Sequence, residues 1–227
     1  MNPFKTIFKH QHWHLLAVLI LLVVLWKFAT SDLTFLSGSL WGMSTFEWFL
    51  IAVAVPILHQ VYVLIIWRLE LHFKGFTKLL GRRAFKLYKF GFGLFMISRL
   101  ASVFILAISN ANSIQLSLAL SIVLSLVFLV PSIYLFYSVA RYFGFDRAVG
   151  MDHFNPEVAR ESQFVKEGIF KYTSNAMYIY GFLVLWIPGI FLCSKAAISV
   201  ALFSHIYIWV HYYCTELPDM KEIYKQE

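Results

Sequence analysis

Residues 116–140 read LSLALSIVLSLVFLVPSIYLFYSVA and contain no charged side chain. A helix needs about 20 consecutive apolar residues to cross the hydrocarbon core of a bilayer, so this stretch alone has the length of a spanning helix. The rest of the chain has the same character, since 60% of its 227 residues are hydrophobic and 14% are charged. A soluble protein of this size needs far more charge on its surface, and the composition therefore indicates an integral membrane protein.

Five further apolar segments accompany this stretch. The six segments that we expect to be helical are 14–30, 47–67, 91–109, 116–142, 177–193 and 196–213. The sequence therefore predicts an all-α protein, a polytopic transmembrane bundle of about six helices. Pro188 and Gly189 predict a kink in the fifth helix. No repeat or linker divides the chain, so we expect a single membrane domain over residues 1–227.

The lysines and arginines indicate how the bundle is oriented. They concentrate in residues 68–89 and 141–171, whereas residues 31–46 and 110–115 contain neither. Basic loops face the cytosol, and an even number of crossings then places both termini there as well. Topology thus explains the net charge of +7, and no nucleic-acid partner is expected. The same asymmetry fits the endoplasmic reticulum or a bacterial inner membrane.

The shortest predicted turn, at Ser194 and Lys195, makes the last two helices antiparallel neighbours. Residues 172–178 and 212–224 should therefore reach the same membrane face. The two most polar regions, 141–178 and 215–222, then face each other. The first of them contains Asp152 and His153, which we add as site candidates because of this local polarity.

Polar side chains inside spanning helices are costly, so each one needs an explanation. They are His59, Gln60, Arg99, His205 and His211. Arg99 can bind an anionic group or pair with an acidic residue, while a lone histidine is more often a packing residue. His211 lies about one turn before Glu216, so the two side chains can approach on one helix face.

Several other kinds of site are not expected. His10, His12 and His14 alternate, which does not place three ligands on one helix face, so we predict no metal site. Cys193 and Cys214 lie at opposite ends of the last predicted helix, about 30 Å apart, too far for a disulfide. The G-x-x-x-x-G-K, H-E-x-x-H and G-x-G-x-x-G motifs are absent, which argues against ATP-driven, zinc-protease and dinucleotide-binding chemistry.

Two motifs in the last third of the chain resemble those of a known enzyme family. Residues 168–178, GIFKYTSNAMY, are similar to the G-x-Y-R-Y-x-R-[HN]-P-M-Y stretch of phospholipid N-methyltransferases and isoprenylcysteine carboxyl methyltransferases. Residues 215–224, TELPDMKEIY, resemble the family ending E-E-P-x-x-x-x-I-Y, with Glu216 at the first acidic position. Ser174, Ala176 and Leu217 depart from the usual Arg, Pro and second Glu.

The resemblance implies that residues 141–227 form a cofactor-binding, methyltransferase-like region. It implies S-adenosylmethionine as cofactor and a membrane-embedded lipid as substrate, with a phospholipid amine favoured over a prenylcysteine carboxylate. The cofactor-binding residues that it implies are Gly168, Lys171, Tyr172, Asn175, Tyr178 and Glu216. An amine must lose a proton during methylation, and Glu216, with His211 or His153, is the candidate base.

Two alternatives remain open at this stage. A noncatalytic polytopic protein, such as a transporter or an assembly factor, would keep the fold without the chemistry. A sterol reductase-like enzyme resembles the same superfamily in its C-terminal region. Binding of the sulfonium cofactor, of a nicotinamide, or of neither separates these possibilities.

Overall fold

The structure is a computed structural model that describes residues 3–161 and 165–224. Five of its helical segments are long and apolar enough to cross a membrane: Gln11–Thr30, Thr45–Phe73, Gly75–Ser109, Leu118–Phe143 and Lys195–Ile223. A sixth apolar segment, Ala176–Phe191, is shorter. The predicted all-α membrane bundle of about six helices is confirmed, with five long segments and one short one, Ala176–Phe191.

The elements follow one another in a simple order. They are α1 (Pro3–Ile7), α2 (Gln11–Thr30), β1 (Ser39–Leu40), β2 (Met43–Ser44), α3 (Thr45–Phe73), α4 (Gly75–Leu80), η1 (Gly81–Arg83), α5 (Ala84–Ser109), α6 (Leu118–Ser138), η2 (Val139–Phe143), α7 (Phe145–Ala148), α8 (Met151–Phe154), α9 (Pro156–Glu161), η3 (Gly168–Lys171), α10 (Ala176–Tyr180), η4 (Gly181–Leu185), α11 (Trp186–Phe191), α12 (Lys195–His211), η5 (Tyr212–Glu216) and α13 (Leu217–Ile223). The elements η2 and η5 are π-helices, and η1, η3 and η4 are 3₁₀-helices.

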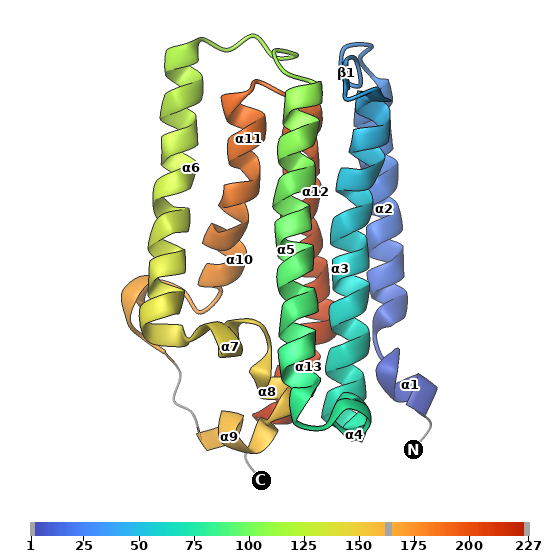
Figure 1. Cartoon of the computed structure of the whole chain (residues 1–227), viewed down its shortest axis with the longest axis vertical. Helices are drawn as coiled ribbons and strands as arrows, with labels where there is room; N and C mark the ends of the chain where they lie inside the picture. The colour runs from blue at the N-terminus through green and yellow to red at the C-terminus, as the bar shows by residue number, and fades with distance from the viewer. Residues whose placement is uncertain (1–2, 162–164, 225–227) are drawn as a thin grey trace.

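The long helices run side by side and alternate in direction (Figure 1). One end of the bundle carries α1, α4, α7 to α9 and α13, and we call it the polar end. The other end carries the antiparallel β1–β2 hairpin, in which Leu40 pairs with Met43, together with the turn before α12. Both predicted basic segments lie at the polar end, and so do the first and last described helices. That the polar end faces the cytosol stays a prediction.

The side chains on the outside of the bundle are apolar, as a lipid environment requires. Leu15, Ile97 and Val130 are each at least 60% exposed. The core between α2, α3, α5 and α12 instead contains fully buried small residues, including Ala52 and Ala107. Small side chains let helix backbones approach closely in a membrane, where packing rather than water exclusion holds helices together.

The fifth apolar segment is irregular along its length. It is divided into α10, the 3₁₀-helix η4 and α11, which contains Pro188. Gly189 allows α11 to pack closely on α12, because a Cβ there would lie 2.7 Å from the backbone nitrogen of Ile198. The predicted antiparallel contact between the last two helices is confirmed.

The helix α3 is longer than the segment 47–67 that the sequence predicted. We placed Arg68 at the start of a basic loop, but α3 continues to Phe73, and both Arg68 and Glu70 are buried. Their polar groups have partners: the Glu70 carboxylate accepts hydrogen bonds from the Thr77 backbone N–H and hydroxyl, at 2.9 Å and 2.5 Å. Burial of a charged helix end is therefore compensated by local contacts.

Candidate functional site

The two motif segments meet at the polar end of the bundle. The Tyr178 hydroxyl, at the start of the fifth apolar segment, donates a hydrogen bond to Oε2 of Glu216, at the end of η5. The Tyr178 ring lies 5.6 Å from the Trp209 ring and 5.2 Å from the Tyr212 ring, measured between centroids. The expectation that residues 172–178 and 212–224 share one face is confirmed, and the contact joins a carboxylate to a group of three aromatic rings.

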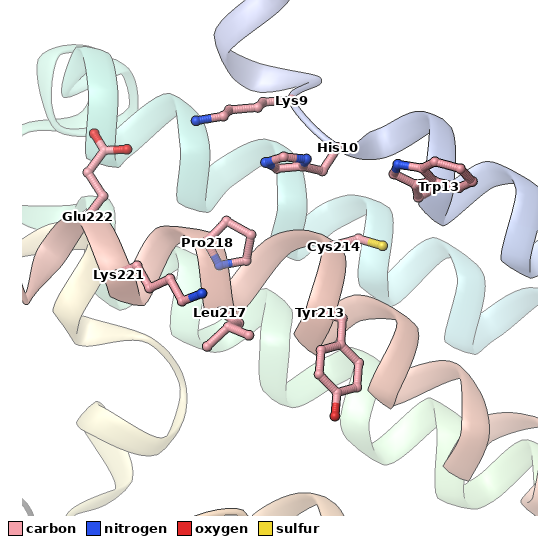
Figure 2. A pocket seen from close by; sticks show the side chains of 9 residues that line it. All are labelled: Lys9, His10, Trp13, Tyr213, Cys214, Leu217, Pro218, Lys221 and Glu222. Atoms are coloured by element: carbon pink, nitrogen blue, oxygen red, sulfur yellow. The ribbon is translucent and has the colours of Figure 1, made fainter.

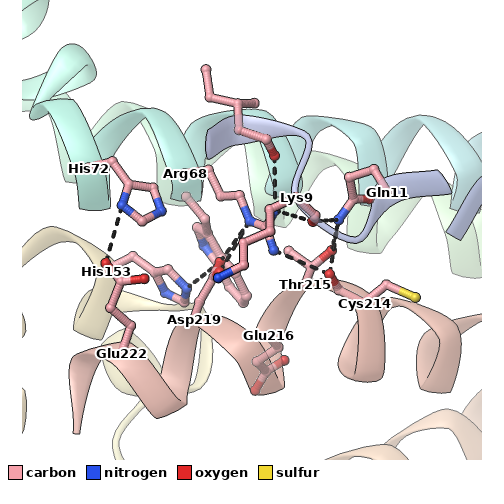
Figure 3. Close-up of polar contacts among 12 residues, drawn as sticks. Lys9, Gln11, Arg68, His72, His153, Cys214, Thr215, Glu216, Asp219 and Glu222 are labelled. Carbon is pink, nitrogen blue, oxygen red and sulfur yellow. Dashed lines mark hydrogen bonds and ion pairs between the residues drawn. The ribbon is translucent and has the colours of Figure 1, made fainter. Parts of the chain in front are cut away.

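A separate cavity of about 600 Å³ lies at the same end, between the start of α2 and residues 213–222 (Figure 2). Neither Tyr178 nor Glu216 lines it. The Glu216 side chain points away from this region, on the opposite side of η5 from the contacts of Lys9 and Gln11 (Figure 3). The polar end therefore holds the Tyr178–Glu216 contact on one side of η5 and the cavity on the other.

Glu216 is positioned by a π-helix, a form that occurs mostly as single turns and often at functional sites. Cys214, inside this turn, has a backbone carbonyl that accepts hydrogen bonds from Gln11 Nε2 at 3.0 Å and from Arg68 Nη2 at 3.2 Å. Gln11 Nε2 also lies 3.2 Å from the Thr215 hydroxyl oxygen. Side chains from α2 and α3 thus donate hydrogen bonds to the free carbonyl of the π-turn.

Arg68 is the centre of this network (Figure 3). The side chain is 1% exposed, and its Nε lies 3.1 Å from Oδ1 of Asp219. Its Nη1 donates to the backbone carbonyls of Ile7 and Lys9, at 3.0 Å and 2.6 Å. One guanidinium therefore ties Ile7, Lys9 and α13 to the end of α3, with its charge and its donors paired.

The two polar regions also contact each other directly, as expected. The Tyr224 hydroxyl donates to Oδ2 of Asp152 at 2.6 Å and accepts from Arg147 Nη2 at 3.1 Å. Burial, together with the hydrogen bond to Asp152, raises the pKa of Tyr224, so it stays a neutral donor. Arg160 Nε donates to the Ile223 carbonyl at 2.7 Å. Asp152, a candidate because of its local polarity, thus holds Tyr224, which follows α13.

The two candidate histidines lie elsewhere. The ring of His153 stacks on Trp67 with centroids 4.0 Å apart, and its Nε2 is 3.5 Å from Oδ2 of Asp219. His211 is buried in the bundle, 5.7 Å from the Trp67 ring and 6.2 Å from the His14 ring. Both therefore adjoin the Arg68 network on α3, whereas Glu216 contacts Tyr178. The sequence allows His211 and Glu216 to approach on one helix face, but the two side chains have different neighbours: Trp67 and His14 for His211, and Tyr178 for Glu216.

The remaining predicted cofactor residues, Gly168, Lys171, Tyr172 and Asn175, differ in their exposure and in their contacts. Gly168 begins η3 with φ +58°, and a Cβ there would lie 2.6 Å from the hydroxyl of Ser138 at the end of α6. Its backbone conformation and this close contact therefore require glycine. Lys171 and Tyr172 are exposed, Tyr172 to 72%. The Asn175 carbonyl accepts the backbone N–H of Tyr178 at 3.1 Å and so begins α10. Of these residues, Asn175 is next to the Tyr178–Glu216 contact in the fold.

The departures from the family motif have different surroundings. Ser174 is exposed, and Ala176 is fully buried in a cluster with Leu135, Val139, Ile169 and Phe170. Leu217 lines the cavity on the other side of η5. Ala176 is therefore packed in an apolar cluster, whereas Leu217 adds an apolar side chain to the wall of the cavity.

The polar residues predicted inside the spans are indeed buried, except that His205 is half-buried. His59 lies against Phe92 and Phe95, with ring centroids 4.7 Å and 5.3 Å away. The Arg99 guanidinium lies 5.1 Å from the Phe182 ring centroid. His205 Nδ1 lies 3.2 Å from Trp186 Nε1, which donates to it. Aromatic faces thus surround most of these groups.

Neither cysteine forms a disulfide. Among the described residues, His10, His12 and His14 do not form a metal-binding group. His14 instead lies 2.9 Å from both Gln11 Oε1 and the Tyr207 hydroxyl oxygen. Within residues 3–161 and 165–224, no group of three His, Cys, Asp or Glu side chains is arranged to hold a metal ion.

Sequence reasoning missed Trp209, Tyr212, Gln11, Arg68 and Asp219. A signal existed for the two aromatic residues, which lie shortly before Glu216 at the end of an apolar run. Nothing local marked Gln11 or Arg68 as site residues, because their partners in η5 and α13 are more than 140 residues away along the chain.

Comparison with known proteins identifies the part of the chain that carries both motifs. Residues 120–227 match the phospholipid methyltransferase family. No curated protein and no solved structure matches the chain significantly. The matched range begins in α6 and includes the motif segments and the Tyr178–Glu216 contact. The resemblance seen in the motifs is confirmed by this match, which covers the chain from residue 120 onward.

Proposed function

We propose that this protein transfers a methyl group from S-adenosylmethionine to a membrane-embedded lipid, and that a phospholipid amine is preferred to a prenylcysteine carboxylate. The observation that carries the proposal is the hydrogen bond between Tyr178 and Glu216. It joins the two motif segments inside the range that matches the family, at one end of a membrane bundle.

The side chains around this contact suit a positively charged ligand. A carboxylate attracts a cation, and aromatic faces add a cation–π contribution of about 0.5–2 kcal/mol. Glu216 supplies the charge, while Tyr178, Trp209 and Tyr212 supply the rings. When bound, S-adenosylmethionine supplies a methyl group on a positively charged sulfur. The residues present therefore fit this cofactor as well as an ammonium headgroup.

Methylation of an amine also needs a proton acceptor, whereas methylation of a carboxylate does not. Glu216 can take this proton on its carboxylate, and Tyr178 acts as a positioning residue because its hydroxyl fixes Oε2. His153 and His211 lie against Trp67 instead, so we assign the role of base to Glu216 alone. A carboxylate base among aromatic rings is what favours the amine substrate.

Positioning accounts for the rest of the chemistry. Methyl transfer is an in-line displacement, so the protein mainly holds donor and acceptor close together and excludes water. The Tyr178 side chain is buried, and the Arg68 network holds the turn that carries Glu216. We infer that the site is formed largely before the ligand binds.

Calorimetric titration of the detergent-purified protein tests the proposal. S-Adenosylmethionine and S-adenosylhomocysteine differ by one methyl group and the sulfonium charge. We expect both to bind the wild type, and we expect Glu216→Gln to weaken S-adenosylmethionine at least tenfold more than S-adenosylhomocysteine. Glu157→Gln, on the exposed side of α9, removes the same charge elsewhere and should change neither.

The two parts of the proposal fail separately. Absence of binding by folded protein at millimolar cofactor would remove the methyltransferase assignment. Equal weakening of both ligands by Glu216→Gln would instead remove Glu216 from sulfonium recognition. Incubation with radiolabelled cofactor and either phosphatidylethanolamine or a prenylcysteine then tests the acceptor, for which we expect label only in the phospholipid.

A further inference from the structure

The cavity on the other side of η5 has the size and place of a second ligand site. Its volume of about 600 Å³ falls within the range of small-molecule sites, roughly 300–1,000 Å³. It lies where the N-terminal segment meets η5 and α13 (Figure 2). Since α2 and α12 are spanning helices that start or end there, the cavity is at the boundary between the membrane and the aqueous phase.

The charged groups of this cavity favour an anion. Lys9, His10 and Lys221 line it from two sides, and Glu222 is its acidic residue. Glu222 Oε1 already lies 3.4 Å from Nδ1 of His72. No ion pair of Lys9 or Lys221 occurs in the described part of the chain. Two lysines therefore remain available for a ligand from outside the protein.

The position of one of these lysines is fixed by the protein. The Lys9 carbonyl accepts hydrogen bonds from Arg68 Nη1 at 2.6 Å and from Gln11 Nε2 at 3.4 Å. Its backbone is thus part of the network, while its side chain is exposed at the cavity. These hydrogen bonds fix the backbone that carries the Lys9 ammonium group at the cavity.

The apolar side of the cavity continues along the bundle toward the membrane. Trp13 and Tyr213 line it and are 59% and 61% exposed, as expected of aromatic residues at a membrane interface. Leu16 and Ile20 follow Trp13 on the same face of α2 and are also exposed. Ile206 is exposed on α12, which packs against α2. A ligand with a charged head and apolar chains fits both parts.

We propose that this cavity binds the phosphate-containing headgroup of an anionic phospholipid, with the phosphate between Lys9 and Lys221 and the acyl chains along the exposed faces of α2 and α12. The site is separate from Tyr178 and Glu216, neither of which lines it. It does not depend on the proposed methyl transfer, because a noncatalytic protein with this surface would bind the same lipid.

The experiment measures lipid preference directly. The full-length protein is placed in nanodiscs with different ratios of phosphatidylglycerol to phosphatidylcholine, and native mass spectrometry counts the lipids that stay bound. We expect the wild type to retain phosphatidylglycerol in preference to phosphatidylcholine. Lys9→Gln/Lys221→Gln should lower this preference about 30-fold, because each lysine near the anionic headgroup contributes a factor of roughly five. Lys9→Arg/Lys221→Arg should keep it.

A matched control removes the same charge from the same end of the protein. Lys78→Gln/Lys86→Gln changes two exposed lysines at the polar end that do not line the cavity, and we expect no change in preference. Equal retention of both lipids by the wild type would overturn the proposal. So would an unchanged preference in Lys9→Gln/Lys221→Gln, or a similar loss in the control.

Two further measurements complete the test. Displacement of phosphatidylglycerol by millimolar inorganic phosphate would show a site for free phosphate and would overturn the lipid assignment. Phosphatidylglycerol with a photoreactive headgroup should label the wild type within residues 9–13 or 213–222. Labelling that is confined to other regions would overturn the proposal even if the glutamine variant did not fold.

Discussion

Replacement of Arg68 by methionine should destabilise the bundle strongly, and the structure allows the effect to be estimated. Arg68 is 1% exposed and paired with Asp219, which is itself 3% exposed. Removing one member of a buried ion pair costs about 3–5 kcal/mol, because the other charge stays buried without its partner. Hydrogen bonds to three backbone carbonyls are lost as well, although Gln11 still donates to the Cys214 carbonyl. We therefore expect Arg68→Met to lower the free energy of unfolding by about 4 kcal/mol.

A double variant separates the charge effect from the loss of packing. In Arg68→Met/Asp219→Asn no unpaired charge remains buried, so the loss should fall to about 2 kcal/mol, less than for Arg68→Met alone. Arg82→Met, at an exposed site in η1, serves as control and should stay within about 0.5 kcal/mol of the wild type.

Unfolding can be followed by tryptophan fluorescence during denaturant titration in detergent at neutral pH. A loss below about 1 kcal/mol for Arg68→Met would refute the reasoning, since it would mean that Asp219 finds other compensation. A double variant less stable than Arg68→Met would refute it too. In that case the guanidinium would contribute through packing and carbonyl contacts rather than through its charge.

Three other predictions concern different parts of the bundle and use the same unfolding assay. Gly168→Ala should lower the free energy of unfolding by about 3 kcal/mol, because Gly168 has a positive φ and lies against Ser138. Gly42→Ala should lower it by about 1 kcal/mol, because Gly42 has a positive φ but open space around it. Similar losses in the two variants would contradict the packing argument. Asn110→Ala should lower the free energy of unfolding by about 3 kcal/mol, because the buried amide donates to the Ser37 carbonyl at 3.0 Å and accepts from Ser194 and Ala196 at 3.1 Å. A loss near zero would show that water replaces the amide. The hydrogen bond from Lys195 lowers the pKa of Asp32 to about 2, so the ionised Asp32 stabilises the fold above about pH 4 and does so less as the pH falls toward 2. Asp32→Asn should therefore reduce the loss of stability between about pH 4 and pH 2. An unchanged dependence of stability on pH would count against the contact.

The parts of the fold that were predictable depend on local sequence. Apolar runs as long as residues 116–142 can hardly be anything other than spanning helices. The short turn at Ser194 and Lys195 forces two helices together, and this alone brought Tyr178 and Glu216 to one end. The end of α3 was wrong because Arg68 looks like a loop residue until its partner, Asp219, is known. Likewise, His153 is polar in sequence but stacks on Trp67, a residue far away along the chain.

The π-turn at Tyr212–Glu216 could not be predicted, and it shows how the first part of the chain contributes to the candidate site. A π-turn leaves backbone groups that a regular helix would pair, and Cys214 pairs its carbonyl with Gln11 and Arg68. Both residues lie outside 120–227, the range that matches the family. The geometry of Glu216 therefore depends on α2 and α3 as much as on its own motif. A motif that specifies the reacting groups leaves their support to the rest of the bundle, which explains why Gln11 and Arg68 could not be found from the motif.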